Sequence, residues 1–252
     1  KPLFEEQHTL EATSRALGGG DRKDKMPLIY TWNYTEASRG RKKAFTLSFF
    51  DAAGEDLEDP QAVATVNRYL QHARGIIFLV DPLQIAGIRE QLEAAGETDL
   101  TSSLRGVQGT TGFEGVLSAI TTLIRTARGI REGDAIDVPV AIAFSKFDQL
   151  TPICGAAVTV QQLPEIVDGQ AVGHVQAQAV DAELRALLEN WDEGAIVSSV
   201  QSNFRDVAFF GVSALGLHNA PDESGSVKRP RPLRVEDPLL WIMAKNHLIT
   251  KE

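Results

Sequence analysis

Cysteine and histidine are scarce in this 252-residue chain, which holds the single cysteine Cys154 and five scattered histidines. One cysteine excludes a framework of disulfides, and the same scarcity excludes a zinc cluster built from cysteine and histidine. A chain with no disulfide framework is typical of a reducing compartment, so the sequence predicts a cytoplasmic location.

Long apolar runs are missing as well. No uncharged apolar stretch reaches the roughly 18 to 20 residues that a membrane-spanning helix needs, and no basic-then-apolar leader stands at the start. The 25 Lys and Arg residues against 34 Asp and Glu give a net charge of −9. This balance disfavours non-specific binding to nucleic acid or anionic lipid, while local donors could still hold a small phosphate ligand. The sequence therefore predicts no membrane span and no nucleic-acid partner.

Apolar residues make up 43% of the chain, which is enough to bury a full core without disulfides or a structural metal. Segments 28–34 and 44–50 flank a polar stretch with a basic tip at 39–43, a pattern typical of an antiparallel hairpin. Segments 75–80, 138–144 and 207–212 are continuous apolar runs. Such runs favour parallel strands that are covered on both faces.

Helical spacing of apolar residues separates these strands. We expect four core-facing helices, at 114–127, at 178–191, from Asp59-Pro60 onward and from Asp237-Pro238 onward. Strands that alternate with helices predict an α/β fold.

Two turns that follow strands carry candidate chemistry. Asp51-Ala52-Ala53-Gly54-Glu55 ends the segment 44–50, at the position where open α/β sheets bind ligands. Asp51 could hold a metal ion through water, and the Gly54 amide could approach an anion. Alone, Asp-x-x-Gly recurs by chance, and a plain strand-ending turn is an equal interpretation.

The segment 138–144 is followed by Ser145-Lys146-Phe147-Asp148. A carboxylate at Asp148 could accept hydrogen bonds from guanine N1 and N2, while the Lys146 stem covers the ring. Each charge-assisted bond is worth roughly 1.5–3 kcal/mol, so Asp148 alone could select the base. At Ser213-Ala214 a backbone amide could reach the base carbonyl, although a plain strand end is the simpler interpretation there.

The order of these motifs, each at the carboxyl end of a successive strand, resembles the third, fourth and fifth motifs of the TRAFAC-class P-loop GTPases. The Asp-Ala-Ala-Gly-Glu spelling, the long insertions and the closing Pro-Leu-Leu-Trp resemble the bacterial double-GTPase family. The resemblance implies a three-layer, doubly wound, mostly parallel sheet with an antiparallel edge hairpin. It implies a single domain over 1–252, with insertions near 84–113 and 151–177.

The resemblance also implies cofactors and roles. GTP or GDP and Mg²⁺ would bind, and a protein partner or activator would act on the switch. A threonine of the first switch loop would bind Mg²⁺, with Thr13 the first candidate and Thr9 the second. The remaining roles are Asp51 for Mg²⁺, the Gly54 amide for the γ-phosphate, Lys146 and Asp148 for guanine, Ser213 as a brace for Asp148, and the Ala214 amide for the base oxygen.

Three features depart from the family pattern. Ser145 replaces the usual asparagine, which predicts weaker nucleotide affinity. Glu55 replaces a water-orienting glutamine, which predicts slow hydrolysis or a need for a partner's arginine. No G-x-x-x-x-G-K-[ST] occurs, and Gly18-Gly19-Gly20 is best interpreted as a flexible loop. We therefore expect a strand, a phosphate loop and a first helix to precede Lys1.

Three hypotheses follow for the function. The first is a GTP-hydrolysing switch with slow intrinsic turnover, and the second is a non-hydrolysing pseudo-GTPase that acts as a protein-interaction module. The third is an unrelated doubly wound protein in which Asp51 and Asp148 arose by chance. Elsewhere, the basic cluster from Lys228 to Arg234 is interpreted as a solvated loop, and Cys154 as a buried or neutral thiol.

Overall fold

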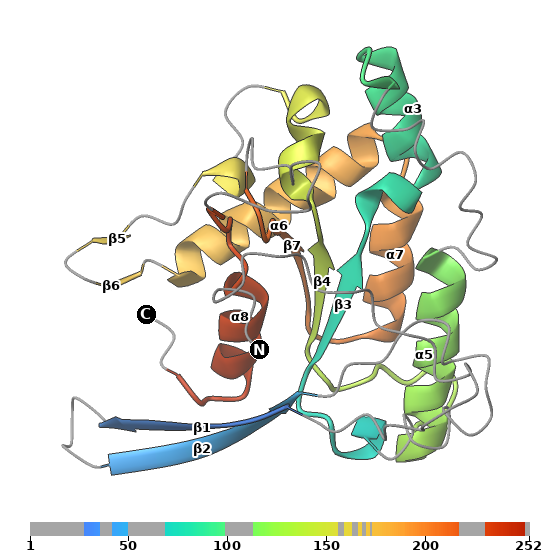
Figure 1. Cartoon of the computed structure of the whole chain (residues 1–252). Coiled ribbons are helices and arrows are strands. Elements are labelled where there is room, and N and C mark those ends of the chain that lie inside the picture. The colour runs from blue at the N-terminus through green and yellow to red at the C-terminus, as the bar shows by residue number, and fades with distance from the viewer. Residues whose placement is uncertain are drawn as a thin grey trace, which may run out of the picture. The chain divides into compact units, whose positions relative to one another are not determined.

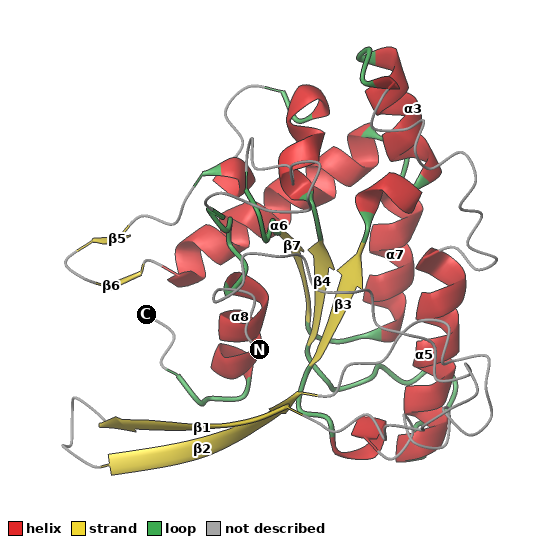
Figure 2. Cartoon of the chain, viewed as in Figure 1, coloured by secondary structure: helices red, strands yellow, loops and turns green. Residues whose placement is uncertain are grey.

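A computed structural model of the chain shows a mixed α/β fold (Figures 1 and 2). It describes residues 28–35, 42–49, 69–98, 113–155, 159–162, 166–167, 170–171, 173–216 and 230–249. The chain divides into two compact units, one formed by Lys1–Leu10 with Ala73–Glu252 and the other by Glu11–His72. Each unit is considered by itself.

The smaller unit contains the predicted antiparallel hairpin. β1 (Leu28–Thr35) pairs with β2 (Lys42–Phe49), with Leu28 opposite Phe49 and Tyr30 opposite Leu47. The rings of Tyr30 and Phe49 meet edge to face at 5.9 Å between centroids. The hairpin prediction is confirmed, whereas the helix expected from Asp59 begins outside the described residues.

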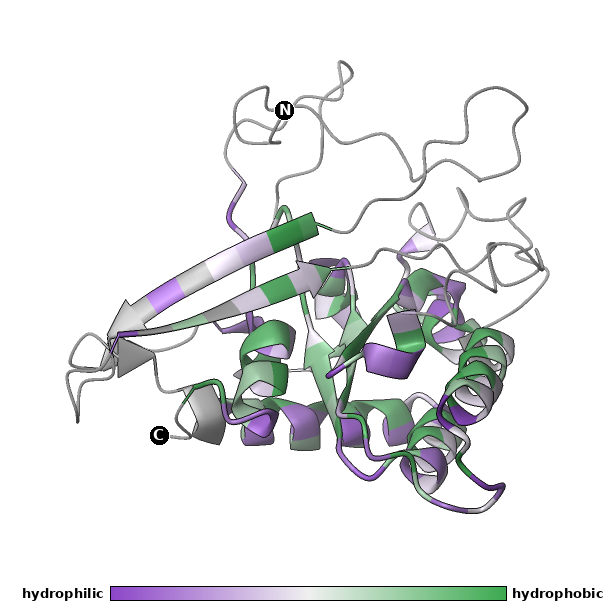
Figure 3. Ribbon diagram, turned by 90° about the horizontal axis from the view of Figure 1, so that it is seen from below, coloured by the Kyte–Doolittle hydropathy of each residue, from purple (hydrophilic) through white to green (hydrophobic). Residues whose placement is uncertain are grey.

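The larger unit is built on three parallel strands, β3 (Ile76–Val80), β4 (Val140–Phe144) and β7 (Val207–Gly211), in the order β3-β4-β7. Their register aligns Phe78 with Ile142 and Ile142 with Phe209. Every residue of β4 is buried, as expected for a central strand without hydrophobic alternation. Green predominates on these strands in Figure 3, which marks their apolar character. The three continuous apolar runs are therefore confirmed as a parallel sheet.

Helices lie on both sides of this sheet, with α6 and α8 on one side and α5 and α7 on the other (Figure 1). The helices expected at 114–127, at 178–191 and from Asp237 are confirmed, and α7 was not predicted. The helices are α3 (Ala86–Ala94), α5 (Phe113–Arg128), α6 (Gly173–Asn190), α7 (Gly194–Asn203) and α8 (Asp237–Lys245). Short elements complete the unit: the 3-10 helices η2 (Pro82–Gln84), η3 (Phe147–Ile153) and η4 (Thr159–Gln161), and the paired strands β5 (Ile166–Val167) and β6 (Gln170–Ala171).

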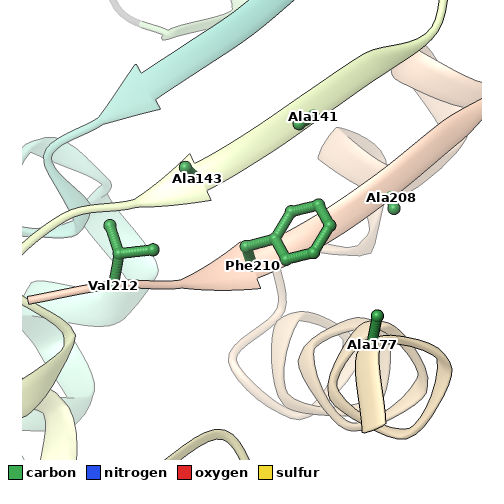
Figure 4. Packing of buried hydrophobic residues seen from close by; sticks show 6 residues of the cluster. All are labelled: Ala141, Ala143, Ala177, Ala208, Phe210 and Val212. Atoms are coloured by element: carbon green, nitrogen blue, oxygen red, sulfur yellow. The ribbon is translucent and has the colours of Figure 1, made fainter. Parts of the chain in front are cut away.

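Small side chains let the helices approach one face of the sheet closely. A Cβ atom on Gly75 would collide with Cγ2 of Ile242, so α8 packs directly on the start of β3. Trp241 of α8 meets Phe210 of β7 edge to face at 6.0 Å. The cluster on this face, shown in Figure 4, consists of Ala141, Ala143, Ala177, Ala208, Phe210 and Val212.

The other face of the sheet carries larger side chains. Phe144 and Phe209 stack there with 6.4 Å between ring centroids. Both are essentially inaccessible to solvent, as are Ile142 of β4 and Val200 of α7. Burial of such side chains is the main favourable term in folding, at roughly 1.5–3 kcal/mol each. Among the helices of the described part of the chain, none combines the length and the apolarity required to cross a membrane.

Candidate functional site

The carboxyl ends of β3, β4 and β7 lie at one edge of the sheet and carry the predicted site residues. The loop after β4 is tied to both neighbouring strands by hydrogen bonds. Both the amide and the hydroxyl of Ser145 donate to the Val80 carbonyl, at 2.8 and 3.0 Å. The Phe147 amide donates to the Val212 carbonyl at 3.1 Å. The loop therefore holds a fixed position between the two outer strands.

Lys146 forms an ion pair at this edge. Its backbone is left-handed with φ of 51°, and its ammonium donates to Oδ2 of Asp81 at 2.8 Å. Oδ1 of Asp81 accepts the Leu83 amide at 3.1 Å and so caps η2. The Lys146 side chain is 51% exposed, so the pair contributes little to stability. The ion pair nevertheless engages the Lys146 side chain, which was expected to cover a base.

Two further members of the predicted base site, Asp148 and Ser213, form hydrogen bonds within their own turns. Asp148 is half-buried in η3, and its carbonyl accepts the Thr151 hydroxyl at 2.7 Å. The hydroxyl oxygen of Ser213, which is 2% exposed, accepts the Gly216 amide at 2.8 Å and is not bonded to Asp148. Ala214 is exposed. Ser213 thus stabilises the turn after β7.

The remaining predicted site residues, Asp51, Gly54, Glu55 and Thr13 with its alternative Thr9, lie outside the described residues. Across the described ranges, no three His, Cys, Asp or Glu side chains are grouped so that they could hold a metal ion. The structure therefore brings Ser145, Lys146, Asp148 and Ser213 to one edge and leaves the predicted Mg²⁺ ligands untested.

Cys154 is buried at the end of η3, as predicted. Desolvation, with a smaller contribution from the negative charge of Glu183, raises the pKa of its thiol to about 12. A thiol with such a pKa is protonated at neutral pH and is a poor nucleophile.

The interpretation of the basic cluster as a solvated loop is wrong for Arg234. This residue is only 3% exposed, and its guanidinium donates to the Gln162 carbonyl at 2.9 Å and to Oδ2 of Asp237 at 2.8 Å. It also donates to the Thr159 carbonyl at 3.2 Å. Arg234 therefore ties η4 to the start of α8. Sequence composition could not show this, because the two carbonyl partners lie 72 and 75 residues away in the chain.

A groove of about 690 Å³ lies between α5 and α7, away from the carboxyl edge. Arg125 on its wall donates to the carbonyls of Arg131 and Asp134, at 2.7 and 2.8 Å. The Thr121 and Thr122 hydroxyls donate to carbonyls of their own helix. The polar groups of the groove thus bond to each other and to backbone, and they indicate no particular ligand.

Comparison with curated proteins finds similarity to a putative ESX-1 scaffolding and assembly protein, SaeC of Mycolicibacterium smegmatis. The two are 28% identical over 197 residues, or 76% of this chain. The chain spans about half of the relative's length, 49%. No protein-family model matches the chain. No solved structure matches it either.

These findings correct the assignment made from the motifs. The matched relative is named for scaffolding and assembly, and no GTPase family matches, so the assignment as a TRAFAC-class or double-GTPase protein is wrong. The hypothesis of a GTP-hydrolysing switch is withdrawn with it, as is the expectation of a phosphate loop before Lys1 that rested on it. The nucleotide and Mg²⁺ predictions, hydrolytic activity and the single domain over 1–252 stay predictions from the sequence, as does the cytoplasmic location.

Proposed function

We propose that this chain is a protein-binding component of a protein assembly, and that the apolar face of its hairpin contacts a protein partner. The proposal is supported by similarity to a relative named for scaffolding and assembly. The observation that carries it is the exposure of large apolar side chains on β1, with Leu28 61% and Tyr30 57% exposed.

The hairpin has two distinct faces. Leu28 and Tyr30 share one face with their cross-strand partners Phe49 and Leu47, because paired residues of antiparallel strands point the same way. The other face is mainly polar: it carries Thr31 and its partner Thr46, which are 3.5 Å apart between hydroxyl oxygens. Ile29, which is 65% exposed, also lies on this face, opposite Ser48. A two-stranded hairpin is marginally stable unless a third strand or another surface covers its apolar face. Cover by a protein partner would supply that contact.

The finer architecture is also a proposal. We infer that β3, β4 and β7 form the middle of a three-layer, doubly wound arrangement. This inference is supported by the parallel strands and by the helices on both sides of the sheet (Figure 1). Such a rigid framework would suit a role in holding partners in position.

Site-specific photocrosslinking in the native host tests the binding role. A benzophenone amino acid replaces Tyr30 on the apolar face or Thr31 on the polar face, and mass spectrometry identifies both crosslinked peptides. We expect discrete adducts with another protein from position 30 and none from position 31. Tyr30→Glu should then abolish the purified complex in gel filtration, while Thr31→Glu preserves it. Matching adducts from both positions, or adducts only within the chain itself, would refute the proposal.

A further inference from the structure

The two outer edges of the central sheet differ in how far side chains cover their backbone groups. On the β7 side, the Phe209 amide donates to Oδ1 of Asp181 at 2.7 Å. Arg185 donates to the Val207 carbonyl at 3.2 Å and pairs with Asp181 at 2.8 Å. Side chains of α6 therefore bond two of the backbone groups that point outward from β7, the Val207 carbonyl and the Phe209 amide. This arrangement blocks the addition of another strand at that edge.

On the β3 side, no side chain of the described ranges covers the outward-pointing backbone groups in this way. The Ile76 amide donates to the Pro139 carbonyl at 3.0 Å, and the Val80 carbonyl accepts the Ser145 amide at 2.8 Å. In a parallel ladder this places the backbone groups of Ile77 and Leu79 on the outer edge. Within the described ranges, β3 has β4 as its one paired neighbour.

The side chains at this edge are apolar and exposed. Leu79 is 70% exposed and Ile77 40% exposed. Their register partners on β4, Ala143 and Ala141, are 1% and 0% exposed. The face that α6 and α8 cover over β4 and β7 is thus most open near the end of β3, at Leu79. Unpaired backbone groups and apolar side chains together favour the addition of a strand.

We propose that β3 pairs antiparallel with β3 of a second copy of this chain, across a two-fold axis beside Phe78. In this register Ile77 lies opposite Leu79 of the second copy, and Leu79 lies opposite its Ile77. The outward amides and carbonyls of both residues then form hydrogen-bonded pairs. Their side chains project to the same face and cover one another. The contact is isologous, as a two-fold axis requires.

Charges at the ends of β3 favour this pairing. The exposed Arg74 lies before the strand, and Asp81 follows it. Antiparallel pairing brings Arg74 near Asp81 of the second copy, whereas parallel pairing brings like charges together. Asp81 already bonds Lys146, and the pair is partly exposed, so the added attraction orients the copies more than it strengthens their binding.

The size of the contact sets its strength. Two five-residue edges bury less than the total of about 1,200–2,000 Å² that is usual for stable complexes. The dimer is therefore weak, and it dissociates on dilution. The inference stands apart from the proposed function, because it involves β3 and a second copy, whereas the proposed function involves the hairpin and a different protein.

Sedimentation velocity of the purified full chain over a concentration series tests the dimer. We expect a reversible monomer–dimer equilibrium in which Leu79→Lys weakens association at least tenfold. The matched control is Val235→Lys, since Val235 is also an exposed apolar residue, at 42%, but lies outside β3. It should dimerise as the unmodified chain does. Tyr30→Glu should dimerise too, so failure of the hairpin proposal would leave this result unaffected.

Cysteine crosslinking tests the register. The paired residues would have Cα atoms about 5.5 Å apart, within the range that a disulfide spans. An oxidised mixture of Ile77→Cys and Leu79→Cys chains should therefore form mixed disulfide dimers. Either variant alone should form few, because like positions are offset by two residues, or roughly 7 Å, along the strand. Cys154 is buried, and the unmodified chain serves as its control.

Two results would overturn the inference. The first is that the chain stays monomeric at every concentration. This includes the case in which the Ile77 and Leu79 amides of the monomer resist hydrogen exchange, because another segment then covers the edge. The other is equal crosslinking in the mixed and single-variant samples.

Discussion

At the scale of single residues, Arg234 makes the clearest contribution to stability. Its guanidinium is buried against Asp237 and two backbone carbonyls, from Gln162 and Thr159. Arg234→Met would leave the Asp237 carboxylate without its partner, at a cost of about 3–5 kcal/mol in the free energy of unfolding. Urea denaturation would measure this loss. Arg231→Met, at an exposed position three residues away, should change the same quantity by less than about 0.5 kcal/mol.

The effect of Arg234→Met should also depend on pH. Desolvation raises the pKa of Asp237 above its ordinary value of 3.8, and the hydrogen bond and charge of Arg234 partly oppose this. The native state therefore holds that proton more tightly than the unfolded chain does. The stabilisation that comes from this bound proton is complete at pH values below the ordinary pKa of Asp237. It is lost as the pH rises through the raised pKa of the native state. Without Arg234 the native pKa rises further, so the variant should lose more stability between acidic and neutral pH. A difference from the unmodified chain that stays constant with pH would contradict this account.

Cys154 should react slowly with thiol reagents in the folded protein. Burial raises the pKa of its thiol to about 12 from an ordinary 9.0, so its thiolate is roughly a thousandfold scarcer at neutral pH. We expect alkylation by iodoacetamide to be slower by at least two orders of magnitude in the native state than in urea. Mass spectrometry of timed samples provides the measurement. Rapid native labelling would mean that the η3 segment opens readily.

At the scale of elements, mutation can test how much the contact of α6 with the edge of β7 contributes to stability. Asp181→Ala removes the acceptor of the Phe209 amide and the partner of Arg185, so it should destabilise the fold by about 2–3 kcal/mol. It should also promote aggregation, because it frees a strand edge. Asp137→Ala is a matched control, since Asp137 pairs with Arg205 at 2.9 Å while 71% exposed. That change should cost less than about 1 kcal/mol in thermal or urea unfolding.

The same scale shows how far the sequence could predict the fold. Continuous apolar runs located β3, β4 and β7, because strands buried on both faces need such residues throughout. β4 starts after the expected residue 138, since Pro139 has no amide to join the ladder. α7 was missed because its buried residues Ile196, Val197 and Val200 are β-branched and lie among serines, a pattern that does not separate helix from strand.

The candidate site was less predictable because its contacts depend on register. Lys146 and Asp81 lie 65 residues apart in sequence and meet only because β3 and β4 align Val80 with Phe144. The polar residues that resembled nucleotide-binding motifs also have structural roles in the loops that follow the strands. Ser145 bonds to the Val80 carbonyl, and Ser213 accepts an amide of its own turn. Turns favour small polar residues, so short motifs of this kind are weak evidence for nucleotide binding.

At the scale of the whole molecule, the division into two compact units predicts independent folding of the larger one. The central sheet and the apolar cluster on its α6 and α8 face lie entirely within residues 73–252. This fragment expressed alone should therefore keep a helical circular dichroism spectrum and unfold cooperatively. Residues 11–72 alone should stay largely unfolded, because the strands described there form a two-stranded hairpin with an exposed apolar face. If residues 73–252 instead bind hydrophobic dyes and unfold without cooperativity, the two units depend on each other, as a single domain over 1–252 would require.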